Sequence, residues 1–422
     1  MKKILIITPH YPPSNLAAVH RSRLFAQHLP EFGWEPIILT VHEDYYEETL
    51  DWNLHKLLPK GQRIEKVKAF SAIAGIGDLG LRALAHLYKR ALQLIRNEEV
   101  EFLYIPIPSF YSALLGRLLH EKTDIKYGVD YIDPWVYELT GNESKHFKHW
   151  LTVKVAKFLE PIAVKKASLI TGVAEGYYKG VQERNPHLIR QAVFGAMPYG
   201  GEKRDHEMLH ELTLKPYLFE KKEGKIQLVY AGAMLPKAYQ PLEAIFKAIS
   251  DTKIAFEQLE IHFIGTGKSA NDENGYNIKP LAEKYSLWQT IIFEYPKRIP
   301  YLDVLIHLDN ADGVFILGST EPHYTPSKTY QGVLSKKPIL AVLHEQSSAV
   351  EILKFANVGV VLPFDGEAGL LIIEQTFMAT WTQYQETLRL FTPQSVNMKS
   401  FEEYSARAVT KSLVNLLNQF TS

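Results

Sequence analysis

Short apolar runs alternate with longer helical stretches from the N-terminus onward, and the alternation starts again in the second half of the chain. This order is typical of parallel β-sheets with helices on both faces. Strands are predicted at residues 3–7, 36–41, 102–105, 126–131, 168–171, 226–231, 259–264, 291–293, 313–318, 339–342 and 358–362. The sequence therefore predicts an α/β protein with two Rossmann-like sheets.

The length of 422 residues exceeds what one hydrophobic core usually organises, which favours two domains. We predict an N-terminal domain over residues 1–198 and a second domain over 225–392. Residues 199–224 are rich in charge, proline and glycine and are interpreted as the connection. A last helix at about 401–420, within the segment 393–422, follows a break at Thr392-Pro393 and can pack back on the first domain.

The composition limits the classes of function. The 47 basic and 47 acidic residues balance, which argues against a nucleic-acid-binding protein. Cysteine is absent, so disulfides, thiolate metal sites and a thiol nucleophile are excluded. The N-terminal apolar run is too short for a signal peptide, and no apolar stretch is long enough to span a bilayer. We expect a cytoplasmic protein.

The stretch after the apolar run 313–318 is the strongest candidate for a binding site. Thr325 is expected to cap a helix in which Pro326 takes the first position. A helix that begins at the carboxyl end of a parallel strand directs free N–H groups toward an anion. Lys328 adds a full charge, and Gln331 on the same helical face can hydrogen-bond a polyol. The alternative is a solvated lysine and a surface glutamine on an ordinary helix.

The first half offers a different set of polar residues. Asp133 follows the strand at 126–131, so it is expected to project into the ligand crevice and bind an acceptor hydroxyl or act as a base. The alternative is an N-cap. Ser14 or Asn15 is predicted to cap the helix at 17–29, and Ser14, Asn15 and Arg21 are assigned to an acceptor or phosphate loop.

No metal site is predicted, because the pairs Asp130/Asp133 and Asp309/Asp312 lack the Asp-x-Asp spacing that clamps a divalent ion on a diphosphate. Gly265-Thr266-Gly267 lacks the third glycine of a dinucleotide loop, so a phosphate turn and a structural turn remain alternatives.

Two predicted helices, at 79–96 and 146–166, are basic on one side. Either can lie on an anionic membrane surface. The alternative for both is an ordinary packed helix, with its apolar side inward and its charges in water.

Taken together, these features resemble the GT-B glycosyltransferases, in particular the retaining, nucleotide-sugar-dependent group numbered family 4. The most specific part is the Pro326-Ser327-Lys328 helix. The resemblance is carried by residues 11–13, 130–135, 167–174, 197–200, 228–232, 262–267 and 326–340. It implies two facing Rossmann-like domains, with the donor held by the second and the acceptor by the first, and a C-terminal helix that crosses back to the first.

The chain departs from this family at two donor-binding positions. Gln331 stands where the family usually has a ribose-binding Glu, and Ala233 follows Gly232 where an Arg usually grips the diphosphate. Lys237 can supply the family's nearby Lys with a shift of one residue. The donor-binding residues that the resemblance implies are Gly232, Lys237, Gly265, Arg298, Thr325, Ser327 and Gln331.

The expected function is metal-independent transfer of a sugar from a nucleotide diphosphate sugar to a hydroxyl acceptor, with Lys328 and Asp133 as catalytic residues. The resemblance implies that the anomeric configuration is retained. No cofactor is expected besides this co-substrate. The acceptor is a saccharide or a lipid-linked saccharide of surface polysaccharide or glycolipid assembly, met at the inner face of the membrane if a basic helix binds lipid. The alternatives are a non-catalytic GT-B-like partner subunit that binds a nucleotide or sugar, and a sugar-nucleotide epimerase.

Overall fold

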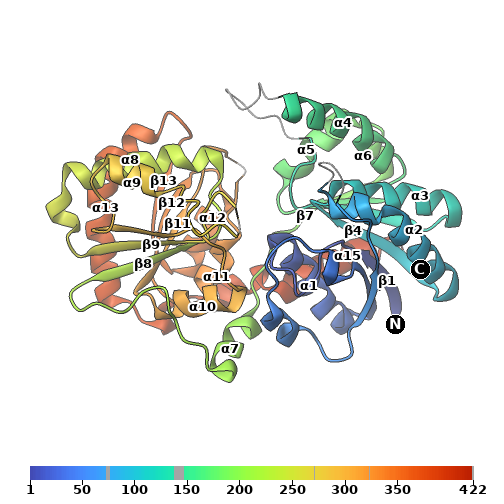
Figure 1. Cartoon of the computed structure of the whole chain (residues 1–422), viewed down its shortest axis with the longest axis horizontal. Coiled ribbons are helices and arrows are strands. Elements are labelled where there is room, and N and C mark those ends of the chain that lie inside the picture. The colour runs from blue at the N-terminus through green and yellow to red at the C-terminus, as the bar shows by residue number, and fades with distance from the viewer. Residues whose placement is uncertain (73–76, 137–146, 270, 323, 421–422) are drawn as a thin grey trace. The chain divides into compact units, whose positions relative to one another are not determined.

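The computed structural model describes residues 1–72, 77–136, 147–269, 271–322 and 324–420. The chain divides into two compact units (Figure 1). Unit 1 consists of Met1–Gly200 and Ala406–Ser422, and unit 2 of Gly201–Ser405. Each unit is built around one parallel sheet, which confirms the predicted α/β class.

The sheet of unit 1 has seven strands in the order β3-β2-β1-β4-β5-β6-β7, and all neighbouring strands are parallel. The strands are β1 (Lys2–Ile7), β2 (Trp34–Val41), β3 (Arg63–Val67), β4 (Val100–Ile107), β5 (Lys126–Tyr131), β6 (Leu169–Gly172) and β7 (Val193–Ala196). Most residues of the inner strands β1, β2, β4, β5 and β6 are buried, as expected for strands covered by helices on each side, whereas the edge strands β3 and β7 are only partly buried.

Helices cover both faces of this sheet. They are α1 (Ala17–His28), α2 (Leu79–Asn97), α3 (Ala113–Thr123), α4 (Phe147–Val164), α5 (Glu175–Arg184), α6 (Leu188–Gln191) and α15 (Ala406–Leu417). Val409 and Leu413 of α15 share a core cluster with Ile4 of β1 and Phe25 of α1. The C-terminal helix therefore returns to the first unit, as the resemblance implies (Figure 1).

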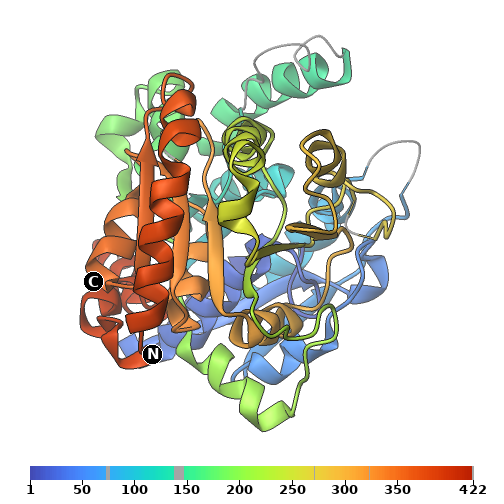
Figure 2. The same ribbon diagram turned by 90° about the vertical axis from the view of Figure 1, so that its left-hand side faces the viewer.

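Unit 2 has six parallel strands in the order β10-β9-β8-β11-β12-β13. The strands are β8 (Ile226–Ala231), β9 (Leu259–Ile264), β10 (Ile292–Tyr295), β11 (Gly313–Leu317), β12 (Ile339–His344) and β13 (Gly359–Phe364). The helices are α7 (Lys203–Leu212), α8 (Tyr239–Asp251), α9 (Lys279–Lys284), α10 (Tyr301–Asn310), α11 (Lys328–Leu334), α12 (Ser348–Ala356), α13 (Leu370–Leu390) and α14 (Met398–Phe401). Figure 2 shows α13 running along the strands of this sheet.

Three elements differ from the sequence prediction. Residues 201–224 belong to unit 2 and contain α7, whose many charges hide the apolar positions Met208 and Leu209 that it buries. The long helix α13 was not predicted, although Phe377, Trp381 and Tyr384 are buried at helical spacing. The last helix begins at Ala406 rather than near residue 401.

The strand order reverses once in each sheet, between β1 and β4 and between β8 and β11. The connections from two such strands leave in opposite directions, so a crevice opens at their carboxyl ends, where open α/β sheets bind ligands. In unit 2 this point lies between Ala231, at the end of β8, and Leu317, at the end of β11.

A buried ion pair joins α1 to β5 in unit 1. The Arg21 Nε lies 2.5 Å from Asp130 Oδ2 and its Nη2 lies 3.0 Å from Oδ1, and both side chains are almost fully buried. Thr171 of β6 donates to the same carboxylate at 2.8 Å, and Arg21 Nη1 donates to the Pro198 carbonyl oxygen at 2.8 Å. These contacts hold α1 on the sheet. Removing either Arg21 or Asp130 would leave the other charge buried without compensation, which is strongly destabilising.

We predict that Asp130→Ala lowers the free energy of unfolding by about 3–5 kcal/mol, since it strands the Arg21 guanidinium in the core. The nearby Asp133→Ala is the matched control, because Asp133 is exposed, and we expect it to change this free energy by less than about 0.5 kcal/mol. Urea unfolding of both variants beside wild type measures the difference. Equal effects of the two substitutions would contradict the structural role of the pair.

Candidate functional site

The chain turns at a glycine directly after the carboxyl end of β8. Gly232, directly after this strand, has φ = +106°, a value that residues with a side chain rarely adopt. A Cβ atom at this position would meet no heavy atom within 4 Å, so the space beside the backbone is open. Glycine therefore allows the chain to turn here, and it leaves the space beside the end of β8 open.

Lys328, the first residue of α11, reaches back from the loop after β11 to the end of β8. Its Nζ lies 3.5 Å from the centroid of the Tyr230 ring, a cation–π contact. The Nζ is buried, and among the described residues it has no hydrogen-bond partner. Burial withholds water from the ammonium and lowers the pKa of Lys328 to about 7. The site therefore holds a buried amine that no described carboxylate pairs with.

Helix α11 starts later than predicted. It begins at Lys328, with Ser327 at the cap position and no capping bond from the Ser327 side chain. The Thr325 hydroxyl is not the cap, because it lies 2.7 Å from the Ser348 hydroxyl and ties the loop to α12. The N–H of Thr329 already donates to the Pro326 carbonyl oxygen. Fewer amides are thus free for an anion than the sequence suggested, and Lys328 carries more of the positive charge.

Lys237 lies in the same loop region. It belongs to a short 3₁₀ turn after β8, and its carbonyl oxygen accepts from the N–H of Thr320, which follows β11. Its Nζ is 3.4 Å from Glu321, and about a third of its side chain is exposed. Because the Lys237 ammonium is partly exposed and the contact is long, the pair is weak, and Lys237 can exchange Glu321 for an incoming anion.

Gln331 lies one turn after Lys328 on α11 and contacts α7. Its Oε1 is 2.9 Å from the Nε2 of His206. Burial lowers the pKa of His206, so the neutral ring donates this bond from Nε2. The Gln331 oxygen is therefore occupied, while its amide nitrogen makes no hydrogen bond with the residues that the structure describes.

The loop after β9 is mainly a structural turn. Gly265 has φ = +70°, and a Cβ at this position would lie 3.7 Å from the Cα of Arg298, which places these two predicted donor residues side by side. The Thr266 hydroxyl donates to Glu294 at 2.8 Å, and the same carboxylate accepts from the N–H groups at the start of α9. Thr266 thus fixes α9, which favours the structural alternative for the Gly265-Thr266-Gly267 turn.

The predicted residues of unit 1 have different surroundings. Ser14 is buried and donates its hydroxyl to Glu48, and α1 is capped at Leu16 without a side-chain bond, so neither Ser14 nor Asn15 caps it. Asn15 is half-buried in the same loop. The Arg21 guanidinium is held by Asp130, which gives it a structural role in place of the predicted contact with an acceptor or phosphate.

Asp133 lies just beyond the carboxyl end of β5. It is exposed, and the stacking of nearby Trp135 on Phe110 at 5.9 Å fixes this part of the chain. Although water reaches the side chain, surrounding protein atoms reduce its hydration and raise the pKa of its carboxyl. A raised pKa favours proton acceptance near neutral pH.

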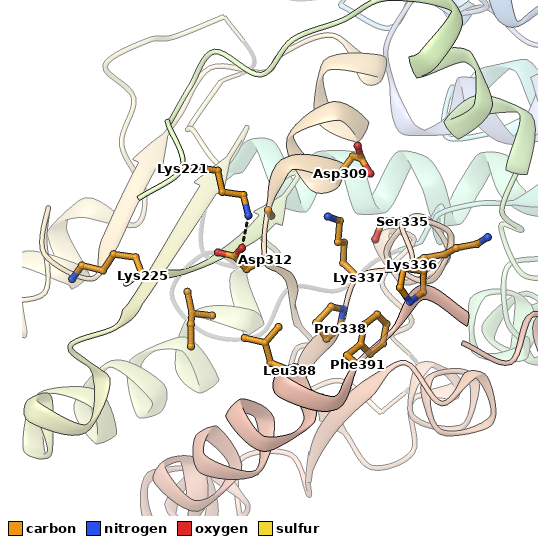
Figure 3. Close-up of a pocket in the computed structure, with 13 residues that line it drawn as sticks. Lys221, Lys225, Asp309, Asp312, Ser335, Lys336, Lys337, Pro338, Leu388 and Phe391 are labelled. Atoms are coloured by element: carbon orange, nitrogen blue, oxygen red, sulfur yellow. Dashed lines mark hydrogen bonds and ion pairs between the residues drawn. The ribbon is translucent and has the colours of Figure 1, made fainter. Parts of the chain in front are cut away.

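A pocket of about 600 Å³ lies at the opposite edge of the unit 2 sheet, near the amino ends of β8, β11 and β12 (Figure 3). Three of its charged residues make structural contacts. Lys221 pairs with Asp312, which also accepts from the Gln227 N–H at 2.9 Å. Lys225 donates to the Glu257 carbonyl oxygen at 2.6 Å. Because ligands of open α/β sheets bind at the carboxyl ends of the strands, we do not assign this pocket to the site.

Three residues near the predicted site residues were missed from the sequence. Tyr230, the partner of Lys328, is the penultimate residue of β8, and the reversal of strand order brings it beside the loop that follows β11. Glu321 pairs with Lys237. His206 hydrogen-bonds the Gln331 side chain and lies in the segment that was interpreted from the sequence as a connection. Only Tyr230 had a sequence signal, since it lies next to the end of the predicted strand 226–231.

No cluster of three or more His, Asp or Glu side chains suited to a metal ion occurs among the described residues. Within the same ranges, no helix is both long enough and apolar enough to cross a membrane.

Comparison by sequence gave no relatives. No protein-family model matches the chain. No curated protein matches it either.

Solved structures share the fold over almost the whole chain. A glycosyltransferase from Rickettsia africae has a TM-score of 0.58 at 16% identity and covers 99% of this chain and 98% of its own. HepE of Anabaena, in complex with UDP, has a TM-score of 0.58 at 12% identity, with coverage of 99% and 100%. Sucrose-phosphate synthase from Thermosynechococcus elongatus has a TM-score of 0.61 at 11% identity, with 99% coverage of both chains. The chain therefore has the GT-B fold, with two Rossmann-like units and a C-terminal helix that returns to the first.

Proposed function

We propose that the chain is a glycosyltransferase that moves a sugar from a nucleotide diphosphate sugar to a hydroxyl acceptor. The observation that carries this proposal is the buried Lys328 ammonium at the point of strand reversal in unit 2, which has no anion partner among the described residues. A diphosphate would supply the missing negative charge. Solved structures of the same fold support the donor class, because HepE of Anabaena is described in complex with UDP and with UDP-glucose.

The chemistry needs positive charge where the leaving group forms. As the bond between the sugar's anomeric carbon and the diphosphate oxygen breaks, negative charge builds up on the departing diphosphate. The Lys328 ammonium is removed from water, so its interaction with that charge is screened little. Lys237, once released from Glu321, adds a second cation. Both therefore stabilise the transition state more than the bound donor.

The remaining roles follow from the chemistry of the acceptor and the ribose. The acceptor hydroxyl loses its proton as its oxygen bonds to the anomeric carbon, and we assign that proton to Asp133 in unit 1. The free amide nitrogen of Gln331 is the donor that we assign to a ribose hydroxyl. Retention of the anomeric configuration and independence from metal ions belong to the proposal through the resemblance to family 4.

The proposed acceptor is a saccharide or a lipid-linked saccharide of surface polysaccharide or glycolipid assembly, used in the cytoplasm at the inner face of the membrane. Its support is the resemblance together with the exposed basic and apolar side chains on α4.

A second candidate is a non-catalytic subunit that binds a nucleotide or sugar. It is favoured by Ala233, which follows Gly232 where the family usually has an Arg, and by the hydrogen bond that occupies the Gln331 oxygen. Both features weaken the grip on a donor. Such a subunit would bind the nucleotide without releasing it from a sugar. A sugar-nucleotide epimerase would instead change the donor without any acceptor.

A screen of sugar nucleotides identifies the donor and separates these candidates. UDP-, GDP- and other sugar nucleotides are tested by thermal shift, since a ligand that binds only the folded state raises the unfolding temperature. Donors that bind are then incubated with a crude lipid and saccharide extract, and free nucleoside diphosphate is measured. Acceptor-dependent release supports the transferase, binding without release supports the subunit, and conversion of the donor alone supports the epimerase.

We predict that Lys328→Met lowers kcat by about 10²–10³-fold, because one charge-stabilising group is lost from the leaving-group site. Lys336→Met is the control, since Lys336 is exposed just beyond the end of α11, and it should keep wild-type turnover. Nucleoside diphosphate release under saturating donor measures both. Wild-type turnover in Lys328→Met would remove Lys328 from the mechanism.

Turnover should be unchanged by chelation. Because lysines rather than a divalent cation neutralise the diphosphate in this proposal, EDTA should change the rate less than about twofold, and added Mg²⁺ or Mn²⁺ should not restore activity to Lys328→Met. Initial rates with EDTA, and with each metal after dialysis, provide the test. Loss of activity in EDTA that returns with one metal would show a metal-dependent enzyme.

The burial of Lys328 also predicts a pH-dependent cost to stability. Its pKa is about 7 when folded and about 10.5 when unfolded, so between these values the unfolded chain binds more protons and stability rises with pH. The stability advantage of Lys328→Met over wild type should therefore be largest at pH 7 and below, and should shrink by about 3 kcal/mol by pH 9.5. Urea unfolding at both pH values measures it, and a constant difference would contradict the buried, lowered pKa.

A further inference from the structure

The two basic helices singled out from the sequence pack differently. Helix α2 is conventional, with Ala83, Leu87 and Ala91 buried in the core and Arg90 paired with Glu65 at 2.8 Å. In helix α4 the usual distribution of side chains is reversed, with small residues inward and large apolar residues outward. Its buried side carries the small residues Ala156 and Ala163, together with Val164 and Glu160. Its outward side carries the large apolar residues Trp150, Leu151, Phe158 and Ile162.

The exposure of these side chains is large. Phe158 is 69% exposed, Trp150 and Leu151 are each 47% exposed, and Ile162 is 41% exposed. Leu151, Phe158 and Ile162 are spaced by seven and four residues, so they share one face of the helix. An aromatic and aliphatic strip of this kind in water marks a surface that binds something apolar.

Lysines predominate among the charged residues of α4 and of the two positions that follow it. Lys154, Lys157, Lys165 and Lys166 are all exposed along residues 150–166, and Lys154 lies over the Trp150 ring at 4.0 Å. Glu160 is the single acidic residue in that range, and it is buried and bonded to Arg184 Nε at 2.8 Å. The outward face therefore combines exposed apolar side chains with exposed lysines.

We propose that α4 is the surface by which unit 1 docks on an anionic lipid bilayer. Phe158, Leu151 and Ile162 enter the boundary between headgroups and acyl chains, while the lysine ammonium groups beside them stay among the anionic headgroups. A protein partner fits this face less well, because protein interfaces are poor in lysine. The proposal does not depend on the transfer activity, but it would bring unit 1 to the surface that holds a lipid-linked acceptor.

Flotation of the full chain with lipid vesicles tests this surface. Wild type should bind vesicles of phosphatidylcholine with phosphatidylglycerol at least about tenfold more strongly than phosphatidylcholine alone, and added salt should weaken the binding. Leu151→Ser combined with Phe158→Ser should reduce binding at least about tenfold without lowering the unfolding temperature, since both side chains are exposed. Leu390→Ser in unit 2, which is 83% exposed, is the apolar control and should float as wild type does.

Two matched double variants test the role of the positive charges. Lys154→Glu with Lys157→Glu on α4 should abolish the preference for anionic vesicles, whereas Lys89→Glu with Arg96→Glu on α2 makes the same change in charge and should keep it. Wild type that stays unbound at every lipid composition overturns the proposal, and so does an equal loss in the α2 variant. Self-association that Leu151→Ser with Phe158→Ser removes, without vesicle binding by wild type, would assign the face to a second copy of the chain.

Discussion

The common direction of the strands in both sheets is the constraint on which the rest of the structure depends. Parallel strands place all their carboxyl ends at one edge, and each connection must cross the sheet as a helix. The order of unit 2 reverses between β8 and β11, so Tyr230 and Lys328 meet although almost a hundred positions separate them in sequence. The site is therefore a product of topology, and the chain between β8 and β11 forms the half of the sheet that holds β9 and β10.

Two of the buried cationic groups, Arg21 and Lys328, have opposite surroundings. In unit 1 the Arg21 guanidinium has a carboxylate partner in Asp130, and the pair holds a helix on the sheet. In unit 2 the Lys328 ammonium has an aromatic ring and no anion among the described residues. An aromatic face offsets only part of the hydration that burial removes. The first arrangement stabilises the fold. The second leaves a poorly hydrated ammonium, which would interact strongly with a bound anion.

Much of the fold could be predicted because strands buried on both faces appear in the sequence as apolar runs. The predicted strands at 126–131, 226–231 and 259–264 match β5, β8 and β9 to the residue. Helix α7 was hidden because its apolar positions are few among charges. Lys328 could be placed at the ligand edge from local pattern alone. The pairing of Arg21 with Asp130 and of His206 with Gln331 could not, because each depends on contacts between residues more than a hundred positions apart.

The lowered pKa of Lys328 has a consequence for how a ligand would be taken up. At neutral pH the buried amine is about half protonated, and a diphosphate placed beside it would favour the charged form. Capture of the ligand would then draw protons from the surrounding buffer, so the heat of association would vary with the ionisation enthalpy of that buffer. Lowering the pH would increase the affinity for the diphosphate until Lys328 was fully protonated in the free protein.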